Sequence, residues 1–178
     1  MAFFLPSAVG TKRNHRDVSF VTARCGLSSY ARPVSHTYSS MLVHCVFSTK
    51  ERRNLIPEPH HLWRYLTGIA KAKQIPLVAV GGTANHVHLL LDLPPTMQLA
   101  QALQQLKGNS SHWLNEENAP FAWQQGYGAF AVGASQRENV LAYFSNQEEH
   151  HKKWTFEQEF ITLLQKYGIE YDSRFVLG

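Results

Sequence analysis

The chain has 178 residues, of which 44% are hydrophobic, and a formal net charge of +4. This length suits one globular domain with a full core, and the lack of any run of about 18 apolar residues excludes a transmembrane helix. The charge does not indicate a nucleic-acid-binding core, because residues 1–36 hold five basic residues against one acidic residue and the remainder is neutral. The two cysteines form no CxxC unit, which fits a reducing cytoplasm.

Residues 1–36 show neither helical nor strand periodicity and carry scattered Gly, Pro, Ser and Arg. This composition predicts a disordered or loosely docked basic leader. A start codon assigned too far upstream is an alternative explanation of the same segment. The domain that carries the chemistry is predicted to span residues 37–178.

The first predicted strand, residues 40–48, is rich in Val, Phe and Leu. A charged loop leads to a helix over residues 60–74, where apolar side chains recur at spacings of three and four. Residues 77–80 and 86–93 then read as two strands joined by a glycine-containing turn, which indicates a hairpin.

Two prolines after this hairpin break the chain, and Thr96 can begin a second helix that extends to about residue 115. Residues 127–132 form a fourth predicted strand. Ser135 followed by Glu138 three residues later matches a capping box and predicts the start of a third helix, which carries Tyr143.

The resulting order, β-α-β-β-α-β with an extra helix, is typical of an α+β fold, the ferredoxin-like (RRM-like) antiparallel sheet. The additional C-terminal helix would carry Tyr143. In the usual strand order of this fold the first and third strands are central, so His86 and His88 are expected in the middle of the sheet.

His86 and His88 are separated by one residue in the third predicted strand. Residues i and i+2 of a strand point to the same face, so both imidazoles can chelate one metal ion. The pair alone is a weak signal, since a strand histidine is more often a packed residue. Gln147 would add a neutral amide oxygen as a third ligand, which leaves the cation a strong Lewis acid for a phosphate oxygen.

Tyr143 lies four residues before Gln147, so the two share one face of the predicted helix. A tyrosine in a helix is more often a packed aromatic residue than a nucleophile. Beside a metal-bound phosphate, however, its phenol can attack, and phenolate leaves readily in the reverse step. A phosphotyrosyl link of this kind allows a strand to be cut and rejoined without ATP.

Several basic residues are candidates for contact with DNA phosphates: Lys50, Arg52, Arg53, Lys107, Lys152 and Lys153. A solvated surface is the alternative interpretation for each of them. Trp113 or Trp123 would be available to stack on bases.

Four other polar residues have two interpretations each. For His44, in the first strand, a structural role facing the sheet is favoured. His150 and His151 follow Gln147 by one turn and offer substitute ligands, although a surface that faces DNA is favoured. Asp92 shares the face of His88 and fits either support of the metal site or a solvated strand end.

The histidine strand and the later segment Tyr143 to His151, YFSNQEEHH, together resemble the single-tyrosine HUH transposases, and within them the branch that includes the REP-associated tyrosine transposases. Supporting segments are residues 42–50, 106–111, 126–130 and 167–172. The resemblance extends over roughly residues 35–175 and leaves out the leader.

The resemblance implies that His86 and His88 are metal ligands, Gln147 the third ligand and Tyr143 the nucleophile, with Mg²⁺ or Mn²⁺ as cofactor. It implies cleavage of single-stranded DNA at hairpin-flanked ends through a 5′-phosphotyrosyl intermediate. It also implies a homodimer in which the tyrosine helix of one subunit completes the metal site of the other.

Two hypotheses of other classes remain. A non-catalytic regulator that binds DNA or RNA hairpins could use the same fold. A zinc hydrolase would need a further ligand and a general base, and no candidate has convincing spacing.

Overall fold

The computed structural model describes residues 38–117, 120–172, 174 and 176. The predicted leader, residues 1–36, lies outside the described residues. The first half of the fold comprises β1 (Leu42–Ser48), η1 (Lys50–Arg52), α1 (Pro59–Ala72), β2 (Leu77–Gly82), β3 (His86–Asp92), α2 (Leu99–Glu117) and β4 (Gly128–Val132). The segment that follows comprises η2 (Ala134–Gln136), α3 (Arg137–Ser145), α4 (Gln147–His151) and α5 (Phe156–Lys166).

The four strands form one antiparallel sheet in the order β2-β3-β1-β4. This order confirms the predicted ferredoxin-like fold, with the first and third strands in the centre. In the register of β1 against β3, Val46 lies opposite His88 and Ser48 lies opposite His86. The histidine pair therefore lies on a strand that is hydrogen-bonded on both sides.

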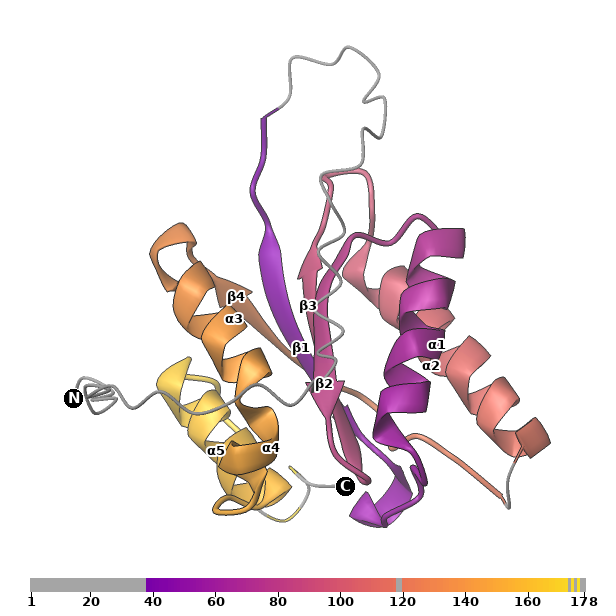
Figure 1. Cartoon of the computed structure of the whole chain (residues 1–178). Coiled ribbons are helices and arrows are strands. Elements are labelled where there is room, and N and C mark those ends of the chain that lie inside the picture. The colour runs from indigo at the N-terminus through magenta and orange to yellow at the C-terminus, as the bar shows by residue number, and fades with distance from the viewer. Residues whose placement is uncertain (1–37, 118–119, 173, 175, 177–178) are drawn as a thin grey trace, which may run out of the picture.

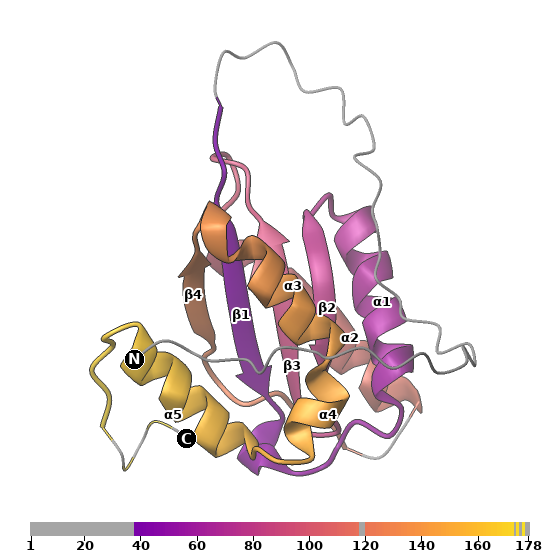
Figure 2. The same cartoon turned by 60° about the vertical axis from the view of Figure 1, so that its left-hand side comes forward.

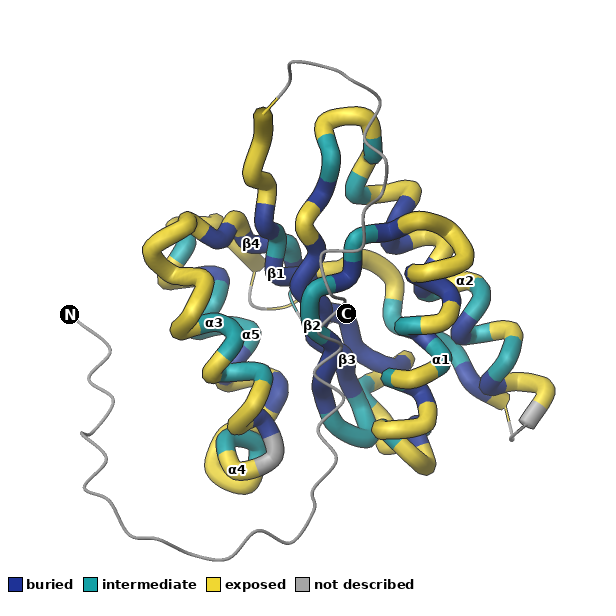
Figure 3. The backbone as a smooth tube through the Cα atoms, turned by 45° about the horizontal axis from the view of Figure 1, so that its top comes forward, coloured by how far each residue is buried: buried dark blue, intermediate teal, exposed yellow. Residues whose placement is uncertain are grey.

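Helices cover both faces of the sheet, with α1 and α2 on one side and α3, α4 and α5 on the other (Figures 1 and 2). The central strands are buried along nearly their whole length between the two layers (Figure 3). None of the described helices is long and apolar enough to cross a membrane.

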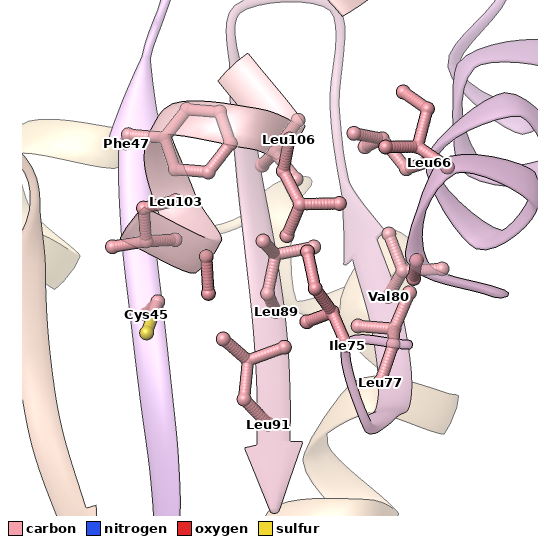
Figure 4. Packing of buried hydrophobic residues seen from close by; sticks show 14 of the residues in the cluster. Cys45, Phe47, Leu66, Ile75, Leu77, Val80, Leu89, Leu91, Leu103 and Leu106 are labelled. Carbon is pink, nitrogen blue, oxygen red and sulfur yellow. The ribbon is translucent and has the colours of Figure 1, made fainter. Parts of the chain in front are cut away.

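The main hydrophobic core lies between the sheet and the α1–α2 layer (Figure 4). Alternate residues of β3, Val87, Leu89 and Leu91, belong to this core. The residues between them point to the other face, where Leu90 packs near Phe144 of α3. His86 and His88 have the same parity as Leu90, so the alternation places them under α3, α4 and α5.

Two small apolar clusters attach this second layer to the sheet. Val46 and Phe130 pack with Phe156 and Leu164 of α5. The other cluster holds Leu42, Leu90 and Val132 together with Val140, Leu141 and Phe144 of α3. The polar residues between the two clusters thus lie between the sheet and the helices of this second layer.

The predicted capping box at Ser135 is wrong. Ser135 lies inside η2, whose N-cap is Gly133, and α3 begins only at Arg137 without any side-chain cap. A capping box does occur at Thr155, which accepts a hydrogen bond from the backbone N–H of Gln158 and opens α5. This last helix was not among the predicted elements.

The predicted third helix is also interrupted. Asn146 has φ −112° and ψ 13°, which ends α3 and begins α4. Tyr143 and Gln147 therefore belong to two successive helices. The predicted β2–β3 turn is shorter than expected, because Gly82 (φ 137°) still pairs in β2, where an added Cβ would overlap the His86 carbonyl.

Candidate active site

His86 and His88 project side by side from β3 toward α3, α4 and α5. Both are buried, and their ring centroids lie 4.9 Å apart. The strand alternation thus produces the paired arrangement that the sequence predicts. A histidine pair on a central strand has little freedom to move, because the backbone on both sides is hydrogen-bonded.

The β2–β3 turn orients the His86 ring. Its Nδ1 lies 2.6 Å from Asn85 Oδ1 and 3.0 Å from Thr83 Oγ1, while Thr83 donates its own hydroxyl proton to Asn85 Oδ1. These acceptors place the proton of a neutral ring on Nδ1. The lone pair is then on Nε2, which points away from the turn and lies 3.2 Å from His151 Nε2.

His44 of β1 orients the His88 ring in the same way. The distance between His44 Nε2 and His88 Nδ1 is 2.9 Å. His88 Nε2 has no hydrogen-bond partner and lies 3.5 Å from Glu159 Oε2. The structural role predicted for His44 is therefore a specific one. His44 orients the His88 ring, whose other nitrogen, Nε2, faces Glu159.

Four side chains from three elements form a cluster that can bind a metal ion. His86 and His88 come from β3, His151 from α4 and Glu159 from α5, and one ligand atom of each lies within 4.8 Å of the others. Three buried atoms of the cluster have no hydrogen-bond partner: His88 Nε2, His151 Nδ1 and Glu159 Oε2. Buried polar atoms without partners are costly, so these residues fit a bound cation.

The protonation states suit metal binding. Burial lowers the pKa of His86 to about 2, of His44 to about 3 and of His151 to about 4, so these rings are neutral at physiological pH. Burial alone would raise the pKa of Glu159, but the neighbouring His88 and the hydrogen bond from Tyr143 hold it below its usual range. His86 and His151 therefore offer neutral imidazoles to the cluster, and Glu159 offers a carboxylate.

Tyr143 of α3 lies directly beside this cluster. Its ring centroid is 5.7 Å from that of His88 and 6.0 Å from that of His44, and its hydroxyl donates a hydrogen bond to Glu159 Oε1. Burial and the adjacent Glu159 charge raise the pKa of Tyr143 above its ordinary value. The phenol is therefore protonated at neutral pH.

Gln147, the first residue of α4, is buried over β2, and neither its amide oxygen nor its amide nitrogen has a partner. Its Oε1 occupies the space that a Cβ would fill at Gly81, the residue opposite His88 in β2. The structure therefore brings Gln147 to the layer that holds the histidines and Tyr143. Its role as third ligand stays a prediction.

The predicted DNA-contacting residues fall in two regions. Lys152 and Lys153 border a cavity of about 380 Å³ that also reaches His86 and His151. Lys50, Arg52 and Arg53 lie in and after η1. There, Arg52 pairs with Glu157 of α5 at 2.9 Å and Arg53 with Glu51 at 3.4 Å.

Lys107 and the two tryptophans lie on the opposite side of the sheet. Lys107 Nζ donates to the carbonyls of Gln124 and Gly126, at 2.8 and 2.7 Å, and contacts the Phe47 ring. Trp123 packs against Phe47, and Trp113 stacks on Tyr65. Their observed contacts are internal to the protein, so a role in DNA binding stays a prediction. Asp92, at the end of β3, is exposed, which fits a solvated strand end.

Sequence reasoning missed Glu159 entirely and gave His151 only a secondary place. The available signal was the periodicity of α5, where Phe156, Glu159, Phe160 and Leu163 have the i, i+3, i+4, i+7 spacing of a buried face. A carboxylate on an apolar stripe is unusual enough to mark a functional candidate.

These features define a ferredoxin-like domain with a metal-binding cluster and a tyrosine on one face of its sheet. The family model for IS200-like transposases matches residues 37–147, well over half of the chain, and includes both strand histidines, Tyr143 and Gln147. The chain therefore belongs to the IS200-like transposase family, enzymes of DNA transposition.

Individual relatives agree with this assignment. The chain is 27% identical over 132 residues to the transposases for insertion sequence element IS200 of Salmonella typhimurium and Salmonella typhi, and these matches cover 68% of this chain and 86% of each relative.

Two solved structures share the fold. One is of a protein from Deinococcus radiodurans R1 described as a candidate transposase, with a TM-score of 0.53 at 22% identity over 65% of this chain and 97% of that one. The other is a REP-associated tyrosine transposase bound to a REP hairpin, with a TM-score of 0.52 at 14% identity over 70% of this chain and 76% of that one.

Proposed function

We propose that this transposase is a metal-dependent single-stranded DNA endonuclease and strand transferase that acts at DNA hairpins through a covalent 5′-phosphotyrosyl intermediate. One observation carries the proposal. The Tyr143 hydroxyl donates a hydrogen bond to Glu159, a member of the cluster in which His86, His88, His151 and Glu159 each bring one possible ligand atom within 4.8 Å of the others. A nucleophile and a cation site are thereby adjacent in a family of DNA-transposing enzymes.

In the cleavage step the Tyr143 oxygen forms a bond to phosphorus while the bond between phosphorus and the 3′-oxygen breaks. The phenol loses its proton, and the leaving 3′-oxygen takes one up. The products are a 5′-phosphotyrosyl link and a free 3′-hydroxyl. Attack by another 3′-hydroxyl reverses the step and joins a new strand, and no oxidant or nucleotide cofactor is needed.

A divalent ion, Mg²⁺ or Mn²⁺, bound by His86 and His88 with Gln147 as third ligand, would withdraw charge from the phosphate. The residues around it orient the reacting groups. His44 and Asn85 fix the histidine rings, and Glu159 fixes the phenol. Since the substrate is DNA, we expect the protein to act in the cytoplasm.

Two features support hairpin DNA as the substrate. A solved structure with the same fold, a REP-associated tyrosine transposase, is bound to a REP hairpin. In this chain Lys152 and Lys153 border the cavity beside His86, which is a suitable position for phosphates that flank the cleavage site.

The test is formation of a covalent adduct. Labelled single-stranded hairpin DNA is incubated with the protein and Mg²⁺ or Mn²⁺ and run on a denaturing gel. We expect an adduct with the wild type and with Tyr127→Phe, which alters an exposed tyrosine, and none with Tyr143→Phe. Binding without any adduct would instead indicate a hairpin-binding regulator, and zinc-dependent hydrolysis that survives Tyr143→Phe would indicate a hydrolase.

The proposal includes the homodimer with active sites completed in trans. The contacts described above lie within one chain, so an exchange would move α3, α4 and α5 together about the extended residue Gly133. We expect a mixture of Tyr143→Phe and His88→Ala chains to recover about a quarter of wild-type adduct, the fraction of intact sites that random pairing produces. No recovery after prolonged mixing would mean that each chain completes its own site.

A further inference from the structure

Glu159 is a buried carboxylate in an unusual position. It is 7% exposed and lies on the inward face of α5 between the buried Phe156 and Leu164. Carboxylates are rarely buried unless a cation or strong donors compensate the charge. Among the described residues its contacts come from three other elements: Tyr143 of α3, His88 of β3, and His150 and His151 of α4.

The two carboxylate oxygens face different groups. Oε1 accepts the hydrogen bond from the Tyr143 hydroxyl. Oε2 has no hydrogen-bond partner and lies 3.5 Å from His88 Nε2 and 3.7 Å from His151 Nδ1, both of which are also without partners. Three unpartnered atoms therefore face one another on the side of Glu159 that is turned away from Tyr143.

The spacing of these atoms suits ligands of one ion. Ligand atoms at about 2.1 Å from a metal ion lie about 3.0 to 3.4 Å apart in octahedral or tetrahedral geometry. The distance of 3.5 Å between His88 Nε2 and Glu159 Oε2 is close to this range, and that of 3.7 Å between His151 Nδ1 and Glu159 Oε2 is slightly longer. At 3.5 and 3.7 Å the histidine–carboxylate contacts of Oε2 are long for direct hydrogen bonds.

We propose that Glu159 and His151 are further ligands of the ion held by His86 and His88, and that Glu159 at the same time positions Tyr143 through its second oxygen. The inference rests on the proposed function, since it concerns the same ion and the same nucleophile. In this arrangement Glu159 would link the ion to the nucleophile, because its Oε2 would bind the metal while its Oε1 accepts the hydrogen bond from Tyr143.

This larger set of metal ligands also affects which ion the site prefers. Three imidazoles and one carboxylate favour a transition ion such as Mn²⁺ over Mg²⁺, because Mg²⁺ selects oxygen ligands and retains water. We therefore expect Mn²⁺ to bind the DNA-free protein at least tenfold more tightly than Mg²⁺.

The test measures Mn²⁺ binding to the full chain without DNA, by electron paramagnetic resonance of free Mn²⁺. Glu159→Gln keeps the shape and removes the charge, and we expect Mn²⁺ to bind at least tenfold more weakly. Glu157→Gln is the matched control, because it makes the same change two residues away at a partly exposed position that pairs with Arg52. We expect its affinity for Mn²⁺ to stay within twofold of wild type.

His151→Ala provides a second variant in case Glu159→Gln does not fold, and we expect a similar loss of Mn²⁺ affinity. Circular dichroism and thermal unfolding in EDTA show whether each variant is folded. Folded Glu159→Gln and His151→Ala proteins that bind Mn²⁺ within twofold of wild type would overturn the inference.

The positioning role requires a separate readout. With Mn²⁺ saturating, Glu159→Gln should lower the rate of adduct formation at least tenfold and leave the Kd for hairpin DNA within twofold. An unchanged rate at saturating Mn²⁺ would refute this role. Because the Mn²⁺ measurement uses no DNA, a wild-type protein that binds Mn²⁺ through Glu159 but forms no adduct would contradict the proposed function alone.

Discussion

Gly81 and Gln147 illustrate how one missing side chain creates room for another. Gln147 Oε1 fills the position of a Cβ on Gly81, and Gly81 lies opposite His88 in the sheet. The pairing of Tyr143 with Gln147 is visible in their sequence spacing, but the need for glycine opposite His88 is not, since it depends on how α4 packs over β2.

Gly81→Ala should displace the Gln147 side chain. If Gln147 is a metal ligand, adduct formation should fall at least tenfold while the protein stays folded. The control is Gly108→Ala, because a Cβ at that helical position meets no other atom within 4 Å. This control should raise the free energy of unfolding by about 0.5–1 kcal/mol, because alanine favours the helix. Equal adduct yields from both variants would exclude a role for Gln147.

The histidine pair could be predicted from the sequence, whereas the partners of Glu159 could not. Strand alternation is a local property, so the spacing of His86 and His88 alone predicts that they share one face. Glu159 reaches Tyr143, His88 and His151 only because α5 folds back along the sheet. Contacts of this kind arise from packing between elements, so the apolar stripe of α5 can mark Glu159 as buried but cannot name its partners.

Among the elements, α5 carries local sequence signals that are sufficient to predict a helix, although it is absent from the predicted elements. Its capping box, Thr155 to Gln158, and its apolar stripe both mark a helix. The break at Asn146 had no comparable signal. It divides the predicted helix into α3 and α4, and in α4 Gln147 lies over Gly81 of β2 while His151 joins the cluster.

Thr155→Ala tests how far α5 depends on its cap. Loss of the hydrogen bond to the Gln158 backbone should lower the free energy of unfolding by about 1 kcal/mol, measured by urea denaturation. Thr162→Ala, in the same helix, removes only a hydroxyl that bonds to the Gln158 carbonyl of the preceding turn, and it should have a smaller effect. A larger loss for Thr162→Ala would show that the cap is not what stabilises α5.

At the level of the whole molecule, the sheet separates a layer that holds the hydrophobic core from a layer that holds the polar cluster and Tyr143. The α1–α2 face holds the large core, and the α3–α5 face holds the polar cluster between two small apolar clusters. Strand order and the ferredoxin-like fold were predictable, because they follow from element order. The close packing of three short helices over the histidines was not.

The reactivity of Cys45, in β1, measures whether the packed sheet stays closed. Cys45 is fully buried, and burial raises the pKa of its thiol to about 12. Since the thiolate is the reactive form, iodoacetamide at pH 8 should leave Cys45 unmodified in the native protein and modify it after unfolding in urea, as measured by peptide mass spectrometry. Rapid modification under native conditions would mean that the sheet opens readily.

The helices α3, α4 and α5 all follow β4 in the chain, and this order has a genetic consequence. A stop codon or frameshift just beyond Val132 would leave an open reading frame that still encodes all four strands and both histidines of β3. Its product would lack Tyr143, Gln147 and Glu159 together, and would expose the apolar residues that α3 and α5 cover. One late mutation can therefore remove these three residues while most of the coding sequence remains intact.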